Sequence, residues 1–135
     1  MTNISTSICL ALVYCDLLVL SSNGAGYDTI DVDACTAAGV LAVNQAGGNK
    51  EGVAEHVMAM MLALSKRIML SDHQMRRSSD YNRRAYMGDD LLERTVGIIG
   101  LGNVGTRVAE LCKGLFRMRV IAYDPYQTAE QLAAK

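Results

Sequence analysis

The stretch from Thr95 to Asp124, TVGIIGLGNVGTRVAELCKGLFRMRVIAYD, decides the fold of this 135-residue chain. It opens with a β-branched apolar run, Val96 to Ile99, which is typical of a strand buried on both faces of a parallel sheet. Apolar residues then recur at helical spacing, at Val104, Val108, Leu111, Cys112 and Leu115. A second apolar run, Val120 to Tyr123, follows. The sequence therefore predicts a strand, a helix and a second strand parallel to the first.

A G-x-G-x-x-G set from Gly100 to Gly105 joins the first strand to the helix. Such a set is a weak signal alone, but here a carboxylate, Asp124, also stands 19 residues after the last glycine, at the end of the second strand. Together these features favour a dinucleotide-binding unit. The alternative is a turn in which the glycines serve packing alone and Asp124 caps a turn with Pro125.

Each position of the glycine set has an expected role. We predict that Gly100 makes the tight turn, that Gly102 lets a pyrophosphate approach the backbone, and that Gly105 allows close packing of helix on strand. The first helical residues, Asn103 and Val104, would present unpaired N–H groups to the phosphates.

The acid at the end of the second strand predicts which cofactor binds. Asp124 can accept hydrogen bonds from both hydroxyls of an adenine ribose, and it would repel a 2′-phosphate. Pro125 and Tyr126, which follow, offer no arginine to bind such a phosphate. The sequence therefore predicts NAD in preference to NADP.

Composition excludes several other classes of protein. The formal net charge is −1, so a nucleic-acid partner is not expected. His56 and His73 are far apart in the sequence, and no C-x-x-C spacing links the cysteines, so we expect no metal site. We expect the cysteines to be buried thiols in a cytoplasmic protein. The apolar run from Ile8 to Cys15 is too short to span a bilayer, and no Lys or Arg precedes it, so we expect a core helix or strand and neither a membrane span nor a signal peptide. The four cysteines are Cys9, Cys15, Cys35 and Cys112.

The residues before the long helix alternate in the same way as the glycine unit. Leu17 to Leu20 reads as a strand, and Asp31 or Asp33 can cap a short helix that ends near Gly39. Val40 to Val43 then reads as another strand. Alternation of this kind predicts a second parallel sheet.

The longest helical pattern runs from Asn49 to Leu70 and is apolar nearly all round. Such a helix must be buried on several sides, so we expect it between two domains or against a second subunit. The segment from Ser71 to Arg94 has five arginines and five acids, which predicts a solvated connector. The apolar stripe of the helix comprises Val53, Val57, Met60, Met61, Leu64 and Ile68.

Three ordered motifs resemble the D-isomer-specific 2-hydroxyacid dehydrogenases. They are NGAGYDTID at Asn23 to Asp31, GVLAVNQAGGNKEGVAEH at Gly39 to His56, and TVGIIGLGNVG followed by MRVIAYDP. The resemblance implies an α/β fold with parts of two doubly wound parallel-sheet domains. Residues 1–48 would end a flavodoxin-like substrate domain, 49–94 would form an interdomain helix and connector, and 95–135 would begin an NAD-binding Rossmann domain.

The resemblance also implies roles for individual residues. The backbone amides of Ala25 and Gly26 would hold a substrate carboxylate, Asn49 would contact the reacting substrate, and Val53 would lie near the nicotinamide. From the residues alone, the NGAG glycines can simply make a turn and Asn49 can cap the helix. His56 does not stand where the family has its catalytic histidine, so we expect a structural role for it.

The sequence thus predicts an NAD-dependent oxidoreductase that transfers a hydride between nicotinamide and a small 2-hydroxy or 2-keto acid. The family's catalytic arginine, acid and histidine would fall beyond Lys135, so we expect a fragment with no turnover of its own and a homodimer formed through the long helix. One alternative is a non-catalytic NAD-binding or dimerisation module. A short-chain reductase is disfavoured, because no tyrosine here is followed four residues later by a lysine.

Overall fold

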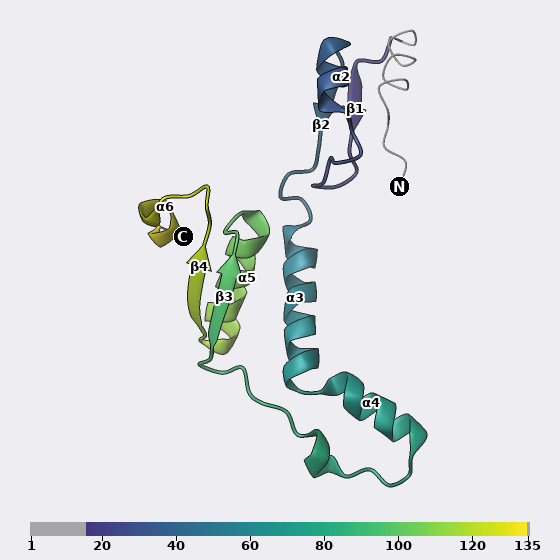
Figure 1. Cartoon of the computed structure of the whole chain (residues 1–135), viewed down its shortest axis with the longest axis vertical. Helices are drawn as coiled ribbons and strands as arrows, with labels where there is room; N and C mark the ends of the chain where they lie inside the picture. The colour runs from purple at the N-terminus through teal and green to yellow at the C-terminus, as the bar shows by residue number, and fades with distance from the viewer. Residues whose placement is uncertain (1–15, 135) are drawn as a thin grey trace. The chain divides into compact units, whose positions relative to one another are not determined.

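The computed structural model describes residues 16–134, which form two compact units: one ends at Asn49 and the other begins at Lys50 (Figure 1). Each unit contains a two-stranded parallel sheet, so the predicted α/β class is confirmed. The expected element from Ile8 to Cys15 lies outside the described residues. Within the described part of the chain, no helix has the length and hydrophobicity that crossing a bilayer requires.

The first unit has the predicted order of strand, helix and strand. Strand β1 (Val19–Ser21) pairs in parallel with β2 (Leu41–Val43), and helix α2 (Val32–Ala37) connects them. The side chain of Asp31 caps α2 by accepting a hydrogen bond from the amide of Ala34 at 2.9 Å. The small core of this unit is formed by Ile30, Cys35 and Val40.

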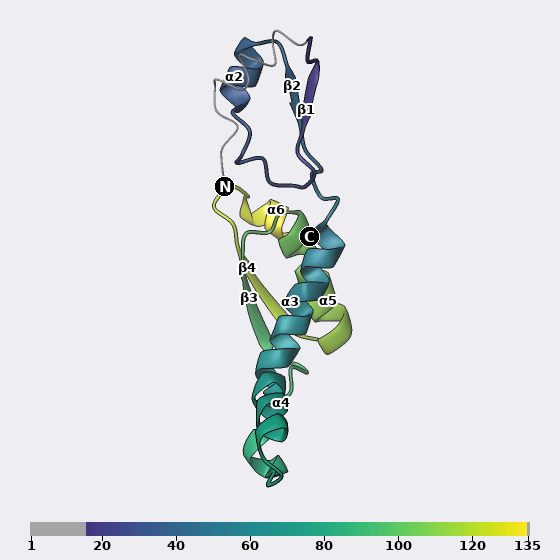
Figure 2. The same ribbon diagram turned by 90° about the vertical axis from the view of Figure 1, so that its right-hand side faces the viewer.

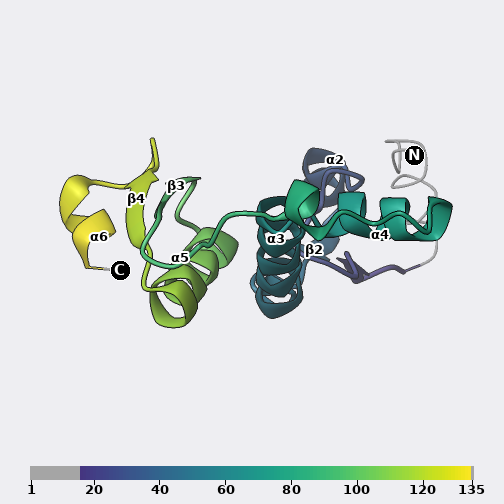
Figure 3. The ribbon, with the colours of Figure 1, turned by 90° about the horizontal axis from the view of Figure 1, so that it is seen from below.

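The second unit is built around helix α5 (Asn103–Phe116). It covers one face of the sheet made by β3 (Thr95–Ile99) and β4 (Arg119–Tyr123), as Figure 3 shows. Helix α3 (Lys50–Ser65) runs along α5 (Figure 2). The remaining elements are α4 (Ile68–Arg77), the short 3₁₀ helix η1 (Arg83–Tyr86) and α6 (Ala129–Ala133). The buried core between α3, α5 and the sheet comprises Ala54, Met58, Val108, Cys112 and Met118.

The expectation that the strand from Val96 to Ile99 is buried on both faces is wrong. Side chains along a strand point alternately to opposite faces, and α5 covers only one of them. On the other face Ile99 is 87% exposed, and Tyr123 is exposed as well. Leu115, expected on the inner face of α5, is 61% exposed, and Phe116 packs against the core instead.

The predicted helix from Asn49 to Leu70 is two helices. Arg67 adopts the left-handed conformation (φ 52°), which ends α3 and starts α4 in a new direction. Helix α4 then continues to Arg77, through residues expected to belong to the connector. An ion pair one turn apart, Asp72 to Arg76 at 2.9 Å, accompanies this helix, and its hydrogen bond holds the pKa of the Asp72 carboxyl below its usual value.

Helix α3 buries one face within this unit, not several. Ala54 and Met58 are buried against α5, and Val57 and Met61 pack beside them at helical spacing. Toward the end of the helix this cover stops, and Leu64 is 80% exposed. The predicted stripe is therefore partly buried at Val57 and Met61 but exposed at Leu64.

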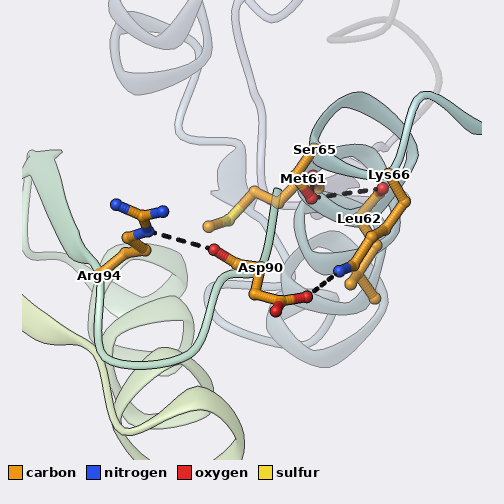
Figure 4. Close-up of polar contacts among 6 residues, drawn as sticks. All are labelled: Met61, Leu62, Ser65, Lys66, Asp90 and Arg94. Atoms are coloured by element: carbon orange, nitrogen blue, oxygen red, sulfur yellow. Dashed lines mark hydrogen bonds and ion pairs between the residues drawn. The ribbon is translucent and has the colours of Figure 1, made fainter. Parts of the chain in front are cut away.

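The connector is fastened to the end of α3 before it enters β3. Gly88 lies so close that an added Cβ would stand 2.0 Å from the carbonyl oxygen of Ser65. Figure 4 shows Asp90 between Lys66 and Arg94. The Lys66 ammonium pairs with the Asp90 carboxylate and keeps its pKa below the usual value, while Arg94 Nε donates to the Asp90 carbonyl at 3.3 Å. These contacts fix where β3 starts relative to α3.

The close packing of α5 on β3 predicts that one methyl group added at Gly105 destabilises the fold. A Cβ at Gly105 would stand 2.0 Å from the carbonyl oxygen of Gly100, so Gly105→Ala must push helix and strand apart. We expect it to lower the free energy of unfolding by about 1–3 kcal/mol in chemical denaturation.

The matched control is Gly114→Ala in the same helix, where an added Cβ meets nothing within 4 Å. We expect it to be neutral or to stabilise the chain by up to about 1 kcal/mol. Equal stabilities for the two variants would contradict the close contact.

Candidate functional site

The turn after β3 has the geometry that its three glycines predict. Gly100 has φ +88°, a backbone conformation that side chains with a Cβ rarely adopt. Gly105 allows the close helix contact described above. Gly102 differs from both, because its φ is −74° and an added Cβ would meet nothing within 4 Å. The space above the Gly102 backbone is therefore open, as a phosphate-binding position requires.

The N-terminus of α5 lies at this open position. Gly102 is the N-cap residue and has no side chain to accept hydrogen bonds from the first turn. The N–H groups of Asn103 and Val104 belong to that turn, where the helix dipole is positive. Thr106 Oγ1 donates to the Leu101 carbonyl at 3.1 Å, so the turn is tied to the helix that it starts. These residues fit a diphosphate group.

The carboxylate of Asp124 lies against the glycine turn. Its Oδ2 atom accepts a hydrogen bond from the Leu101 amide at 2.9 Å, although the two residues are 23 positions apart. Its Oδ1 atom accepts one from the Tyr126 amide at 2.9 Å, so Asp124 also caps the turn that follows β4. The capping alternative and the nucleotide hypothesis are thus compatible. The glycine turn and the carboxylate at the end of β4 are thus in direct contact.

A surface hollow of about 250 Å³ opens beside the start of α5. Arg107 borders it and forms ion pairs with Glu51 of α3 at 2.7 Å and with Glu110 at 2.9 Å. The hydrogen bonds that the Arg107 guanidinium donates to Glu110 and Glu51 raise its pKa. The pairs hold the first turn of α3, with the partly exposed Val53, beside the glycine turn. The hollow is lined by Lys50, Gly102, Asn103, Thr106, Arg107 and Glu110.

The loop of the first unit orients two backbone amides. The carbonyl of Gly24 accepts a hydrogen bond from the Gln45 amide at 2.9 Å, and the carbonyl of Ala25 accepts one from Asn44 Nδ2 at 2.7 Å. In a trans peptide the N–H points opposite to the C=O, and the described residues contain no cis bond. The amides of Ala25 and Gly26 therefore point away from Gln45 and Asn44. This loop presents two N–H donors in fixed directions.

Asn49 and the two histidines, which the sequence analysis also considered, all lie on the surface. Asn49 immediately precedes α3 and is exposed. His56 on α3 and His73 on α4 are exposed too. Among residues 16–134, no cluster of acids, histidines and cysteines could hold a metal ion. Cys35 and Cys112 are buried free thiols, as predicted, and burial raises the pKa of Cys112.

Two polar residues at these sites escaped the sequence analysis. Gln127 Nε2 donates to Asp124 Oδ2 at 2.6 Å, and Asn44 holds the Ala25 carbonyl. Both act through hydrogen bonds to the residues that the motifs identified. A glutamine three residues after Asp124 was the available signal, but its direction depends on the turn at Pro125.

Comparison with known proteins agrees with this geometry. The sequence model for the NAD binding domain of D-isomer specific 2-hydroxyacid dehydrogenases matches residues 58–135. A D-3-phosphoglycerate dehydrogenase from Archaeoglobus fulgidus is 41% identical over 123 residues, which are 89% of this chain and 23% of that protein.

Solved structures give the same result. The NAD⁺-bound 3-phosphoglycerate dehydrogenase of Entamoeba histolytica is 32% identical with a TM-score of 0.69, covering 96% of this chain and 37% of that one. D-2-hydroxyisocaproate dehydrogenase gives a TM-score of 0.82 at 27% identity, covering 96% of this chain and 39% of that one.

A parallel βαβ unit with a glycine turn and a terminal acid defines a dinucleotide-binding protein of the Rossmann type. This chain belongs to the D-isomer-specific 2-hydroxyacid dehydrogenase family, whose matched domain binds NAD. It spans about a quarter of the length of the curated relatives that it matches.

A substitution at Gly102 tests cofactor binding with little effect on the stability of the fold. Because an added Cβ meets no protein atom and φ is ordinary, Gly102→Ala should change the free energy of unfolding by less than about 1 kcal/mol. The same methyl group would occupy the approach to the backbone, so we expect NAD affinity to fall at least about tenfold, measured by calorimetry.

Gly114→Ala, at the far end of α5, serves as the control and should bind NAD like the unmodified chain. Unchanged affinity in Gly102→Ala would exclude a diphosphate from this position.

Proposed function

We propose that this chain is part of an NAD-dependent oxidoreductase that transfers a hydride between nicotinamide and a small 2-hydroxy or 2-keto acid. The observation that carries the proposal is the hydrogen bond from the Leu101 amide to Asp124, because it brings the acid at the end of β4 against the glycine turn, as a nucleotide that contacts both would require. Family membership supports the reaction class.

The second unit would bind the ADP half of the cofactor. Gly100 and Gly105 shape the turn, and Gly102 leaves room for the diphosphate. The N–H groups of Asn103 and Val104 would donate to it. Asp124 would accept hydrogen bonds from the adenine ribose, and its charge would disfavour a 2′-phosphate. These assignments are supported by the geometry described above.

Residues near the start of α3 and in the first unit would contact the substrate and the nicotinamide. The oriented amides of Ala25 and Gly26 suit a substrate carboxylate, and Asn49 would contact the same substrate. Val53 would lie against the nicotinamide ring, which supplies the hydride chemistry when the cofactor is bound. The arginine, acid and histidine that complete the reaction in the family have no counterpart that we can assign within this chain.

Residues on α3 and α4 would form a homodimer interface. Exposed apolar side chains are concentrated there, and contiguous patches of this kind mark contact surfaces. The buried free thiols of Cys35 and Cys112 favour a cytoplasmic location. The exposed apolar residues of the patch include Met60, Leu64, Ile68, Met69 and Leu70.

Thermal melting with and without NAD tests the binding proposal, since a ligand that binds only the folded form raises the midpoint. We expect saturating NAD to raise the midpoint of the unmodified chain and to raise that of Asp124→Ala much less. The comparison uses the ligand-induced shift, because Asp124 also bonds to Leu101 and Tyr126 and its loss lowers the ligand-free midpoint.

Asp124→Asn, which keeps one acceptor oxygen, should fall between the two. No shift in the unmodified chain would refute the proposal. In a parallel assay, NADH with glyoxylate, hydroxypyruvate or 3-phosphohydroxypyruvate should not be consumed by the chain alone, and clear consumption would mean that catalytic residues lie within it.

Sedimentation velocity tests the dimer. Leu64→Glu places a charge in the patch without disturbing the α3–α5 contact, so it should shift the chain toward monomer. Leu115→Glu, at another exposed leucine, on α5, is the matched control and should leave the distribution unchanged. A monomeric unmodified chain, or equal effects of both variants, would rule out this interface.

A further inference from the structure

Gln127 connects the two halves of the nucleotide pocket. Its side-chain amide donates to Asp124 Oδ2 at 2.6 Å and to the Leu101 carbonyl at 3.1 Å. The Leu101 amide donates to the same carboxylate oxygen at 2.9 Å. Leu101, Asp124 and Gln127 therefore form a closed ring of hydrogen bonds, with one member in the glycine turn, one at the end of β4 and one before α6.

This ring fixes the orientation of the Asp124 carboxylate. An aspartate side chain has two rotatable bonds, and a carboxylate at a strand end could otherwise turn toward solvent. Here the donors from Leu101 and Gln127 hold Oδ2 on the turn, and the Tyr126 amide holds Oδ1. The ring therefore sets the direction in which the two carboxylate oxygens of Asp124 face.

The chemistry of glutamine suits this place better than that of a charged residue. Its amide has two N–H donors, one for the carboxylate and one for the carbonyl, and it carries no charge. It therefore holds Asp124 without neutralising it. A lysine or arginine at this position would offset the acid and attract a 2′-phosphate, whereas a glutamate would repel Asp124 from the turn.

We propose that Gln127 is a positioning residue for Asp124: it holds the acid against the glycine turn in the orientation that accepts the adenine ribose, and thereby contributes to the selection of NAD over NADP. This rests on the proposed function for cofactor binding. The competing account is that Gln127 only closes the turn before α6, in which case it would affect stability and not cofactor choice.

The test uses Gln127→Met, which keeps the length of the side chain and removes both donors, in the full chain. We expect NAD affinity to fall about 3- to 10-fold, the effect that the net contribution of one ordinary hydrogen bond gives, while NADP affinity changes little. In the Asp124→Ala background, Gln127→Met should have no further effect, because residues that act through one another are not additive.

The matched control is Gln131→Met. Gln131 lies four residues later and makes a capping box with Thr128 outside the ring, so its loss disturbs α6 and spares the ring. Its NAD affinity should equal that of the unmodified chain. Gln127→Lys keeps a donor and adds a charge, so it should hold Asp124 in place and raise NADP affinity relative to NAD.

A second readout needs no cofactor. Amide hydrogen exchange at Leu101 reports its bond to Asp124, and it should accelerate at least about threefold in Gln127→Met but not in Gln131→Met. If the unmodified chain binds no NAD, the proposed function fails, and this readout alone decides whether Gln127 holds Asp124. Should Gln127→Met fail to fold, Gln127→Ala, which also removes both donors, takes its place in the affinity and exchange measurements.

Three results would overturn the inference. One is unchanged Leu101 exchange in Gln127→Met. Another is an equal loss of NAD and NADP affinity, which would indicate a structural role for Gln127. The last is an additive loss in the double variant, which would mean that Gln127 does not act through Asp124.

Discussion

The contact between the backbone of α5 and the end of β3 sets the geometry on which the second unit depends. Gly105 brings the helix so near to the Gly100 carbonyl that no Cβ fits between them. That approach fixes the first turn of α5 directly beyond the strand, with its N–H groups facing the open space above Gly102. A helix held further away would still pack, but its N-terminus would not face the position where a diphosphate can approach the backbone.

Hydrogen bonds extend this geometry from the turn to the second strand. The acid at the end of β4 reaches the turn through the Leu101 amide, and Gln127 spans both. On the other side of the turn, ion pairs take the place of these hydrogen bonds. Arg107 is shared between Glu51 and Glu110, and so joins the start of α3 to the start of α5. Polar contacts rather than apolar burial thus fix the residues around the hollow.

Several apolar side chains of the second unit are exposed. Only one face of the β3–β4 sheet and one face of α3 are covered among the described residues, which leaves Ile99 and Leu64 exposed. Because the curated relatives are about four times as long as the matched region, their remaining residues have the length to cover such faces. The exposed apolar side chains explain why the sequence predicts burial on both faces for the strand from Val96 to Ile99 and on several sides for the long helix.

Sequence alone determined the βαβ order, the roles of Gly100 and Gly105, an acidic cap of α2 at Asp31 or Asp33, and the pairing of the glycine turn with Asp124, because each follows from local periodicity or from backbone restrictions on single residues. Tertiary structure decided which face of α3 is buried, the break at Arg67 and the ring through Gln127. Those features depend on which surfaces meet and on the direction of individual hydrogen bonds, and neither is encoded in the spacing of residue types.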